Sequence, residues 1–124
     1  MTYFTLPLPP SVNALYRNVP KVGRVKTRAA KDWYTQAAVM MAQQHVRQVS
    51  GRICVTYSVG RHPDKRKRDV ANYEKALSDS LVANKVIEDD SLIESLRIHW
   101  TDLEPAGTVG VSIVSVGAGV GRAA

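Results

Sequence analysis

The sequence is poor in cysteine, since Cys54 is the only one among 124 residues. A single cysteine cannot form an internal disulfide, which excludes the small secreted scaffolds that disulfides hold together and indicates a reducing compartment. One cysteine and three scattered histidines also argue against a structural zinc site. We therefore expect an ordinary hydrophobic core, which the 44% content of hydrophobic residues is sufficient to build.

Long apolar runs are missing as well. No stretch approaches the roughly 20 apolar residues that a membrane-spanning helix needs, and no signal peptide opens the chain. The length predicts a single domain, residues 1–124, in which the Gly/Ala-rich residues 117–124 form a flexible tail. We expect no membrane partner and a cytoplasmic location.

Acidic residues are fewer than basic ones, 11 against 17, which gives a formal net charge of +6 and a pI near 9.7. Twelve of the 17 bases lie in two short stretches. The first holds Arg17, Lys21, Arg24, Lys26, Arg28 and Lys31, and the second holds Arg61, Lys65, Arg66, Lys67, Arg68 and Lys75. Two such clusters favour a polyanionic partner, nucleic acid first, because phosphate neutralisation supplies much of the affinity for DNA and RNA.

Hydrophobic periodicity predicts a small α/β protein. We expect strands at residues 3–8, 52–59, 92–100 and 108–116, and helices at about 28–49 and 70–84. Residues 11–28 show no sustained period and are expected to form a long loop, and the last two strands are expected to pair as a hairpin. The order β-α-β-α-β-β predicts a single-domain α/β sandwich, in which helices pack on a small mixed β-sheet.

Acidic residues stand beside the second basic stretch. Asp69 follows the run Arg66–Arg68 at the expected start of a helix, and Asp89 and Asp90 precede the strand at 92–100. A helix N-cap at Asp69 and a polar turn at Asp89–Asp90 would each be an ordinary structural role. Alternatively, carboxylates from a helix start and a strand start can meet at one edge of a sheet and hold Mg²⁺, which takes oxygen ligands and assists phosphodiester hydrolysis.

Two further side chains fit the second interpretation. Lys75 could stabilise the attacking or leaving oxygen of a phosphodiester. Asn72 could orient a metal ligand or a metal-bound water.

Three motifs resemble the RusA family of Holliday-junction resolvases. L-P-L-P-P-S-V-N-A-L-Y-R at residues 6–17 is similar to the family's opening L-P-x-P-P-S-x-N-x-x-Y-R. P-D-K-R-K-R-D-V-A-N-Y-E-K-A at residues 63–76 is similar to its P-D-[basic]-R-D-x-D-N-x-x-K-A, and residues 81–90 are similar to its segment that ends in D-D. The resemblance runs from about residue 3 to 116 in matching order and spacing.

The resemblance implies a dimeric, Mg²⁺-dependent endonuclease that cuts four-way DNA junctions in recombination and repair, with Mn²⁺ as a substitute ion and no small-molecule cofactor. It assigns catalytic roles to Asp69, Asn72, Lys75 and Asp90, and metal binding to Asp69, Asp90 and Asp89. It also assigns DNA binding to Arg17, Lys21, Arg24, Lys26, Arg28, Lys31, Lys65, Arg66, Lys67 and Arg68. Phage origin and association with the nucleoid would follow.

Ala71 departs from the family pattern, which has an aspartate at this position. The departure removes one carboxylate and predicts weaker metal binding and impaired hydrolysis. It also reduces the repulsion between the protein and DNA, so that junction binding should persist. An engineered inactive nuclease and a naturally inactive junction binder are both compatible with Ala71.

The residues leave other functions open. A non-catalytic protein that recognises branched DNA by charge and shape would bind junctions without cutting them. An RNA-binding protein is a weaker alternative, because the sequence shows no aromatic stacking platform and Phe4 is the only phenylalanine. A homodimer is expected on symmetry grounds too, since paired cuts in a two-fold junction need two active sites.

Overall fold

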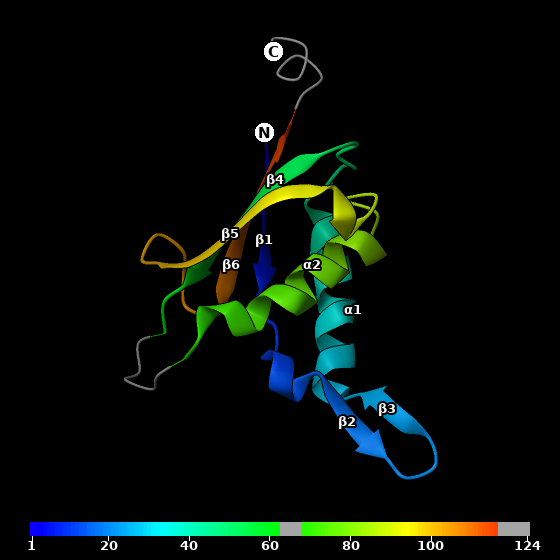
Figure 1. Cartoon of the computed structure of the whole chain (residues 1–124). Coiled ribbons are helices and arrows are strands. Elements are labelled where there is room, and N and C mark those ends of the chain that lie inside the picture. Colours follow the sequence, from blue (N-terminus) through cyan, green and yellow to red (C-terminus); the bar gives the residue numbers. More distant parts are fainter. Residues whose placement is uncertain (63–67, 117–124) are drawn as a thin grey trace.

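The computed structural model describes residues 1–62 and 68–116. The elements follow in chain order: β1 (Thr2–Pro7), the 3₁₀ helix η1 (Val12–Ala14), β2 (Tyr16–Val19), β3 (Gly23–Lys26), α1 (Arg28–Gln43), β4 (Ile53–Gly60), the 3₁₀ helix η2 (Val70–Tyr73), α2 (Glu74–Ala83), the 3₁₀ helix η3 (Asp90–Leu92), β5 (Ile93–Thr101) and β6 (Thr108–Ser115). Figure 1 shows both helices on the same side of the main sheet. The predicted α/β class with a small mixed sheet is confirmed. The proposed tail at residues 117–124 lies outside the described residues.

The main sheet has the strand order β1-β6-β4-β5. β6 pairs antiparallel with β1 and β4, whereas β5 pairs parallel with β4. Along β4, Ile53, Val55, Tyr57 and Val59 are buried, and the residues between them are only half-buried. This alternation identifies one face of the sheet as the core face, which the helices cover. The core also contains Phe4, Leu6, Trp33, Ala37, Met41, Leu77, Leu81, Val109, Val111 and Ile113.

The predicted hairpin between the last two strands is wrong, because β4 lies between β5 and β6. The connection from β5 to β6 crosses the end of β4, where Gly60 lies against the backbone of Pro105. A Cβ atom at Gly60 would overlap the Pro105 carbonyl, so the crossing requires glycine there. Sequence proximity alone favoured the hairpin.

The predicted loop over residues 11–28 is also wrong, because the segment contains η1 and the antiparallel hairpin β2–β3. Most hairpin residues are exposed, so the alternation of polar and apolar residues that marks a half-buried strand is absent. Lys21 and Gly23 take positive φ values of 63° and 98° in the turn. The hairpin projects away from the main sheet, at the lower right of Figure 1.

Helix α1 ends at Gln43, six residues before the predicted end at Val49. His45 has a φ of 55° and donates to the Ala42 carbonyl, while the N–H of Val46 donates to Met41. This is the Schellman arrangement, which usually has glycine at the left-handed position. Because histidine occupies that position here, no glycine marks the end of the helix in the sequence. The Gln44 side chain bonds to both the N–H and the carbonyl of Thr5, which satisfies part of the free edge of β1.

The second predicted helix, residues 70–84, begins as the 3₁₀ helix η2 before α2. Neither α-helix in the described part of the chain is long and apolar enough to cross a membrane.

Candidate active site

Asp69 caps the entry to η2. Its side chain accepts a hydrogen bond from the Ala71 N–H at 3.1 Å, and its own backbone is extended, with φ −91° and ψ 114°. The expected N-cap is therefore present. Ala71 is exposed in the same turn, and the half-buried Asn72 donates its backbone N–H to the Asp69 carbonyl at 3.0 Å. The turn thus holds three of the residues singled out by the sequence.

Lys75 lies in the first turn of α2. Its Nζ atom is 3.3 Å from Oδ2 of Asp79, one helical turn further along the same face. Both side chains are about half exposed, so the ion pair orients the ammonium group more than it stabilises the fold. Asp79 was missed at the sequence level, although its spacing of four residues from Lys75 places it on the same helix face.

Asp89 and Asp90 lie next to each other at the start of η3. The Asp89 side chain accepts from the Ser91 N–H at 3.3 Å, and this bond lowers the pKa of Asp89, with a further contribution from its hydrogen bond to Asp90. The same bond between the carboxyl groups raises the pKa of Asp90, as do desolvation and the charges of Asp89 and Asp79. Asp90 is therefore the member of the pair that retains its proton to higher pH.

A pocket between α2 and the start of β5 brings Lys75 and Asp90 together. Its lining is mixed, with charged residues beside two apolar residues of β5: Glu74, Lys75, Ser78, Asp79, Asp90, Ile93 and Leu96. Lys75 lies at the start of α2, and the rest of that helix and the following turn separate it from Asp90. The pocket combines a cation with carboxylates, which is a suitable arrangement for binding a phosphate together with a metal ion.

Asp69 lies toward the C-terminal end of β5, whereas Asp90 lies just before the start of that strand. Tyr73, the last residue of η2, packs edge-to-face on Trp100 with ring centroids 6.2 Å apart, whereas Asp90 directly precedes β5 in η3. Trp100 lies seven positions after Ile93, which corresponds to about 23 Å of extended strand. Within one chain Asp69 and Asp90 therefore lie toward opposite ends of β5, because α2 runs antiparallel to β5 and its start lies beside the end of the strand (Figure 1). That these acids bind one metal ion stays a prediction.

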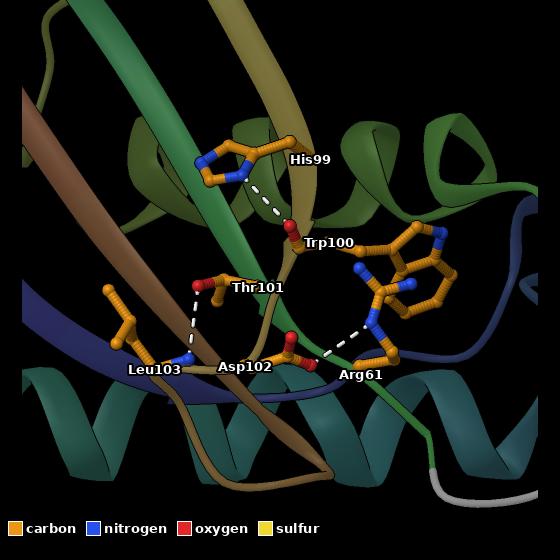
Figure 2. A network of polar contacts seen from close by, with 6 residues as sticks. All are labelled: Arg61, His99, Trp100, Thr101, Asp102 and Leu103. Carbon is orange, nitrogen blue, oxygen red and sulfur yellow. Dashed lines mark hydrogen bonds and ion pairs between the residues drawn. The ribbon is translucent and has the colours of Figure 1, made fainter.

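Polar contacts join the end of β5 to the end of β4, and Figure 2 shows the Arg61–Asp102 ion pair among them. Arg61 forms an ion pair with Asp102 at 3.1 Å. His99 donates Nδ1–H to the Trp100 carbonyl at 3.0 Å, so in the neutral ring Nε2 accepts from the Ser58 hydroxyl at 3.0 Å. These bonds give His99 a structural role.

The first basic stretch forms one exposed region. Arg17, Lys21, Arg24 and Lys26 belong to the hairpin β2–β3 and its turn, and Arg28 and Lys31 to the first turn of α1. From the second stretch, Arg68 is half-buried before Asp69, whereas the predicted DNA-binding residues Lys65, Arg66 and Lys67 lie outside the described residues.

Two tyrosines that the sequence analysis did not single out carry cations over their rings. The Arg24 guanidinium lies 4.4 Å from the ring centroid of Tyr16, and the Lys26 ammonium lies 4.3 Å from that of Tyr34. Both tyrosines line a groove between α1, α2 and the hairpin, to which Asp79 and Asp90 also contribute. The groove therefore adjoins the pocket that contains Lys75.

Comparison with known proteins gives consistent matches. A family model described as "Endodeoxyribonuclease RusA" matches residues 7–113. The crossover junction endodeoxyribonuclease rusA of Enterobacteria phage HK97 is 31% identical, over 91% of this chain and 93% of its own length. The corresponding proteins of Escherichia coli K12 and Enterobacteria phage 82 are each 27% identical, over 91% and 93% of this chain and 93% and 95% of their own lengths.

Proposed function

The chain belongs to the RusA family of endodeoxyribonucleases, and from this we propose that it acts on four-way DNA junctions. The observation that carries the proposal is the family match over residues 7–113, which includes Asp69, Lys75 and Asp90 in order. The pocket shared by Lys75 and Asp90 supports it, because it brings together two of the residues that the family resemblance assigns to catalysis. The protein would be a Holliday-junction resolvase of recombination and repair, working in the cytoplasm at the nucleoid.

In this function the protein's own groups bind and orient the DNA. The exposed bases of the hairpin and of the start of α1 would contact backbone phosphates, which positions the junction without reading its sequence. The Lys75 ammonium, held by Asp79, would face a phosphate in the pocket and stabilise negative charge on an oxygen as the bond breaks.

The carboxylate oxygens in this pocket are suitable ligands for Mg²⁺, or for Mn²⁺ in its place. Asp79 and Asp90 line the same pocket, and Mg²⁺ is commonly held by one or two carboxylates with water completing its shell. Across the described ranges, no three His, Cys, Asp or Glu side chains gather into a ready-made metal site. We propose Asp90 as the principal ligand on this side, with Asp89 beside it; a bound ion would neutralise phosphate charge and activate water.

A homodimer would allow Asp69 and Asp90 to act together although they lie apart within one chain. β5 is an edge strand of the main sheet, and residues 94–97 along it are exposed. Two copies related by a two-fold axis through this edge would run their β5 strands antiparallel, which places the Asp69 end of one strand beside the Asp90 end of the other. The carboxylates that the family pattern combines would then come from both copies.

Ala71 leaves this chain with one carboxylate fewer than the family pattern. We propose that its catalysis is impaired for that reason and that its binding of junctions is retained. The same observation favours the second candidate function, a non-catalytic protein that binds branched DNA by structure.

The two functions separate in one experiment. The chain and its Ala71→Asp variant are incubated with a four-way junction and with duplex of the same sequence, in Mg²⁺ and in Mn²⁺. We expect both to bind the junction in preference to duplex, Ala71→Asp to make paired cuts, and the unchanged chain to cut far more slowly. Lys75→Ala in the Ala71→Asp background should abolish the cuts.

Three outcomes would count against these proposals. A folded Ala71→Asp protein that binds junctions and leaves them intact would favour the non-catalytic function. Rapid cutting by the unchanged chain would contradict the proposed impairment. Equal binding of junction and duplex, or stronger binding of structured RNA in competition, would contradict both junction functions.

A further inference from the structure

Three recesses on the helix side of the molecule form one continuous track. The first, on the hairpin, is lined by Val12, Asn13, Tyr16, Arg17, Asn18 and Arg24. It shares Tyr16 with the groove between α1, α2 and the hairpin, and that groove shares Asp79 and Asp90 with the pocket that contains Lys75. The track therefore leads from a basic end on the hairpin to the candidate active site.

Aromatic and apolar surfaces line the middle of this track. Tyr16 and Tyr34 are both half-buried there, and Ala38 and Val82 contribute methyl groups to the same groove. Desolvation raises the pKa of Tyr34 to about 12, with smaller contributions from Asp79 and Tyr16, so its hydroxyl stays neutral at physiological pH. Aromatic rings beside methyl groups suit a flat, weakly polar ligand.

Cations accompany both rings. Arg24 lies over Tyr16 and Lys26 over Tyr34, and both cations come from β3. A ligand that placed a flat ring on a tyrosine would therefore bring its neighbouring groups within reach of a positive charge. A nucleotide meets both requirements, because its base is a flat ring and its phosphate is an anion.

We propose that this groove binds an unpaired nucleotide of the junction, with its base stacked against Tyr16 or Tyr34 and its phosphate beside Arg24 or Lys26. The inference rests on the proposed function and adds a specificity site to it. The face of a base is hidden in an intact duplex, so a groove that takes it selects DNA whose bases can leave the stack, as at the crossover point of a junction. The continuity of the track would lead the same strand to Lys75 and Asp90.

Photo-crosslinking of the full, unaltered chain tests the proposal directly. 5-Iodouracil is placed in a four-way junction either beside the crossover or in the middle of an arm, and irradiated complexes are analysed by mass spectrometry of the crosslinked peptides. We expect crossover positions to crosslink to Tyr16 or Tyr34 and mid-arm positions to leave both tyrosines unmodified. Crossover crosslinks only at other residues would overturn the proposal while leaving the proposed function intact.

Tyrosine variants give an independent measurement. Tyr16→Leu should lower the preference for junction over duplex on the order of 10-fold, the range of one lost base–aromatic stack, whereas Tyr16→Phe should preserve it. Tyr3→Leu is the matched control, since Tyr3 is an exposed tyrosine of β1 that bonds to Glu104 and lines none of the three recesses. Thermal melting checks that each variant folds.

The possible outcomes distinguish a failure of the groove assignment from a failure of the proposed function. An unchanged preference in folded Tyr16→Leu and Tyr34→Leu variants would overturn the groove assignment. A chain that shows no preference for junctions before any substitution would overturn the proposed function and the groove assignment together.

Discussion

The Lys75 ammonium and the Asp79 carboxylate face each other across one turn of α2, 3.3 Å apart, at the edge of the pocket that Asp90 also lines. Asp79 therefore acts on two groups at once. It holds the lysine in place, and its charge contributes to the raised pKa of Asp90, after the hydrogen bond that Asp90 donates to Asp89 and after desolvation. Its removal should change both the titration of Asp90 and the position of Lys75.

Asp79→Asn should lower the pKa of Asp90, because one neighbouring negative charge is lost. A raised carboxyl pKa means that the folded chain holds this proton more tightly than the unfolded chain. The stabilisation from Asp90 is therefore complete below its ordinary pKa and is lost as the pH rises through the raised value. Carboxyl NMR titration measures the shift, and Asp32→Asn is the control because Asp32 pairs with Arg28 on α1. An unchanged Asp90 titration would contradict the electrostatic coupling.

The same substitution should impair cutting in the Ala71→Asp background. We expect kcat to fall between about 10- and 100-fold because the lysine is no longer oriented, with a smaller change in KM. Asp79→Glu should recover part of the loss, since it restores the negative charge. An equal loss in both variants would indicate that Asp79 matters for another reason.

A second prediction concerns a buried hydroxyl relay. The Tyr57 and Ser78 hydroxyls are 2.9 Å apart in the core, and Ser78 donates to Glu74 at the edge of the Lys75 pocket. Ser78→Ala would leave the Tyr57 hydroxyl buried without this partner, and should lower the free energy of unfolding by about 1–3 kcal/mol. Ser80→Ala is the control, because Ser80 is equally buried but bonds only to the Leu77 carbonyl of its own helix. Urea denaturation measures both; equal losses would mean that the relay adds nothing.

A third prediction concerns the hairpin. Arg17→Ala and Lys21→Ala should each reduce the slope of log affinity against log salt by about 1 if each residue neutralises one phosphate. Arg52→Ala is the control, since Arg52 lies outside the hairpin, directly before β4, and forms an ion pair with Glu94 at 2.7 Å. Fluorescence anisotropy with a labelled junction at several salt concentrations provides the slopes. Unchanged slopes in the hairpin variants would contradict the assignment of the hairpin to the DNA-binding surface.

The sequence predicts the elements that pack against the core and misses those that do not. β4 and α1 show clear periodicity because one face of each is buried, and the cap at Asp69 follows from its place before a helix. The hairpin β2–β3 has no such signal, since most of its residues are exposed and it buries no regular face. Helix ends with His45 or Lys85 in the left-handed position also carry no glycine to mark them.

The candidate site was predicted in its residue types and not in its arrangement. Lys75 and Asp90 do meet in one pocket, but the distance between Asp69 and Asp90 depends on the direction in which α2 crosses β5. That direction is set by packing between segments far apart in the sequence. Asp79, Tyr16 and Tyr34 become visible only when the helices and the hairpin are placed together.

The last prediction tests whether two copies share each active site. Asp69→Asn and Asp90→Asn, each introduced into the Ala71→Asp background, should both be inactive as pure proteins. If one site combines Asp69 of one copy with Asp90 of the other, a mixed dimer contains one site with both aspartates intact and one with both replaced. Mixing the two inactive proteins should then restore nicking of a four-way junction at one position.

The alternative arrangement predicts the opposite result. If both aspartates act within one chain, every site in a mixed dimer is damaged and mixing restores nothing. The opposite placement of Asp69 and Asp90 along β5 favours recovery. Subunit exchange is verified by mass spectrometry of differently tagged chains, and the control mixture pairs Asp69→Asn with Asp69→Asn Lys75→Ala, which carries no intact Asp69 in either chain. Verified mixed dimers that fail to nick would contradict the shared site.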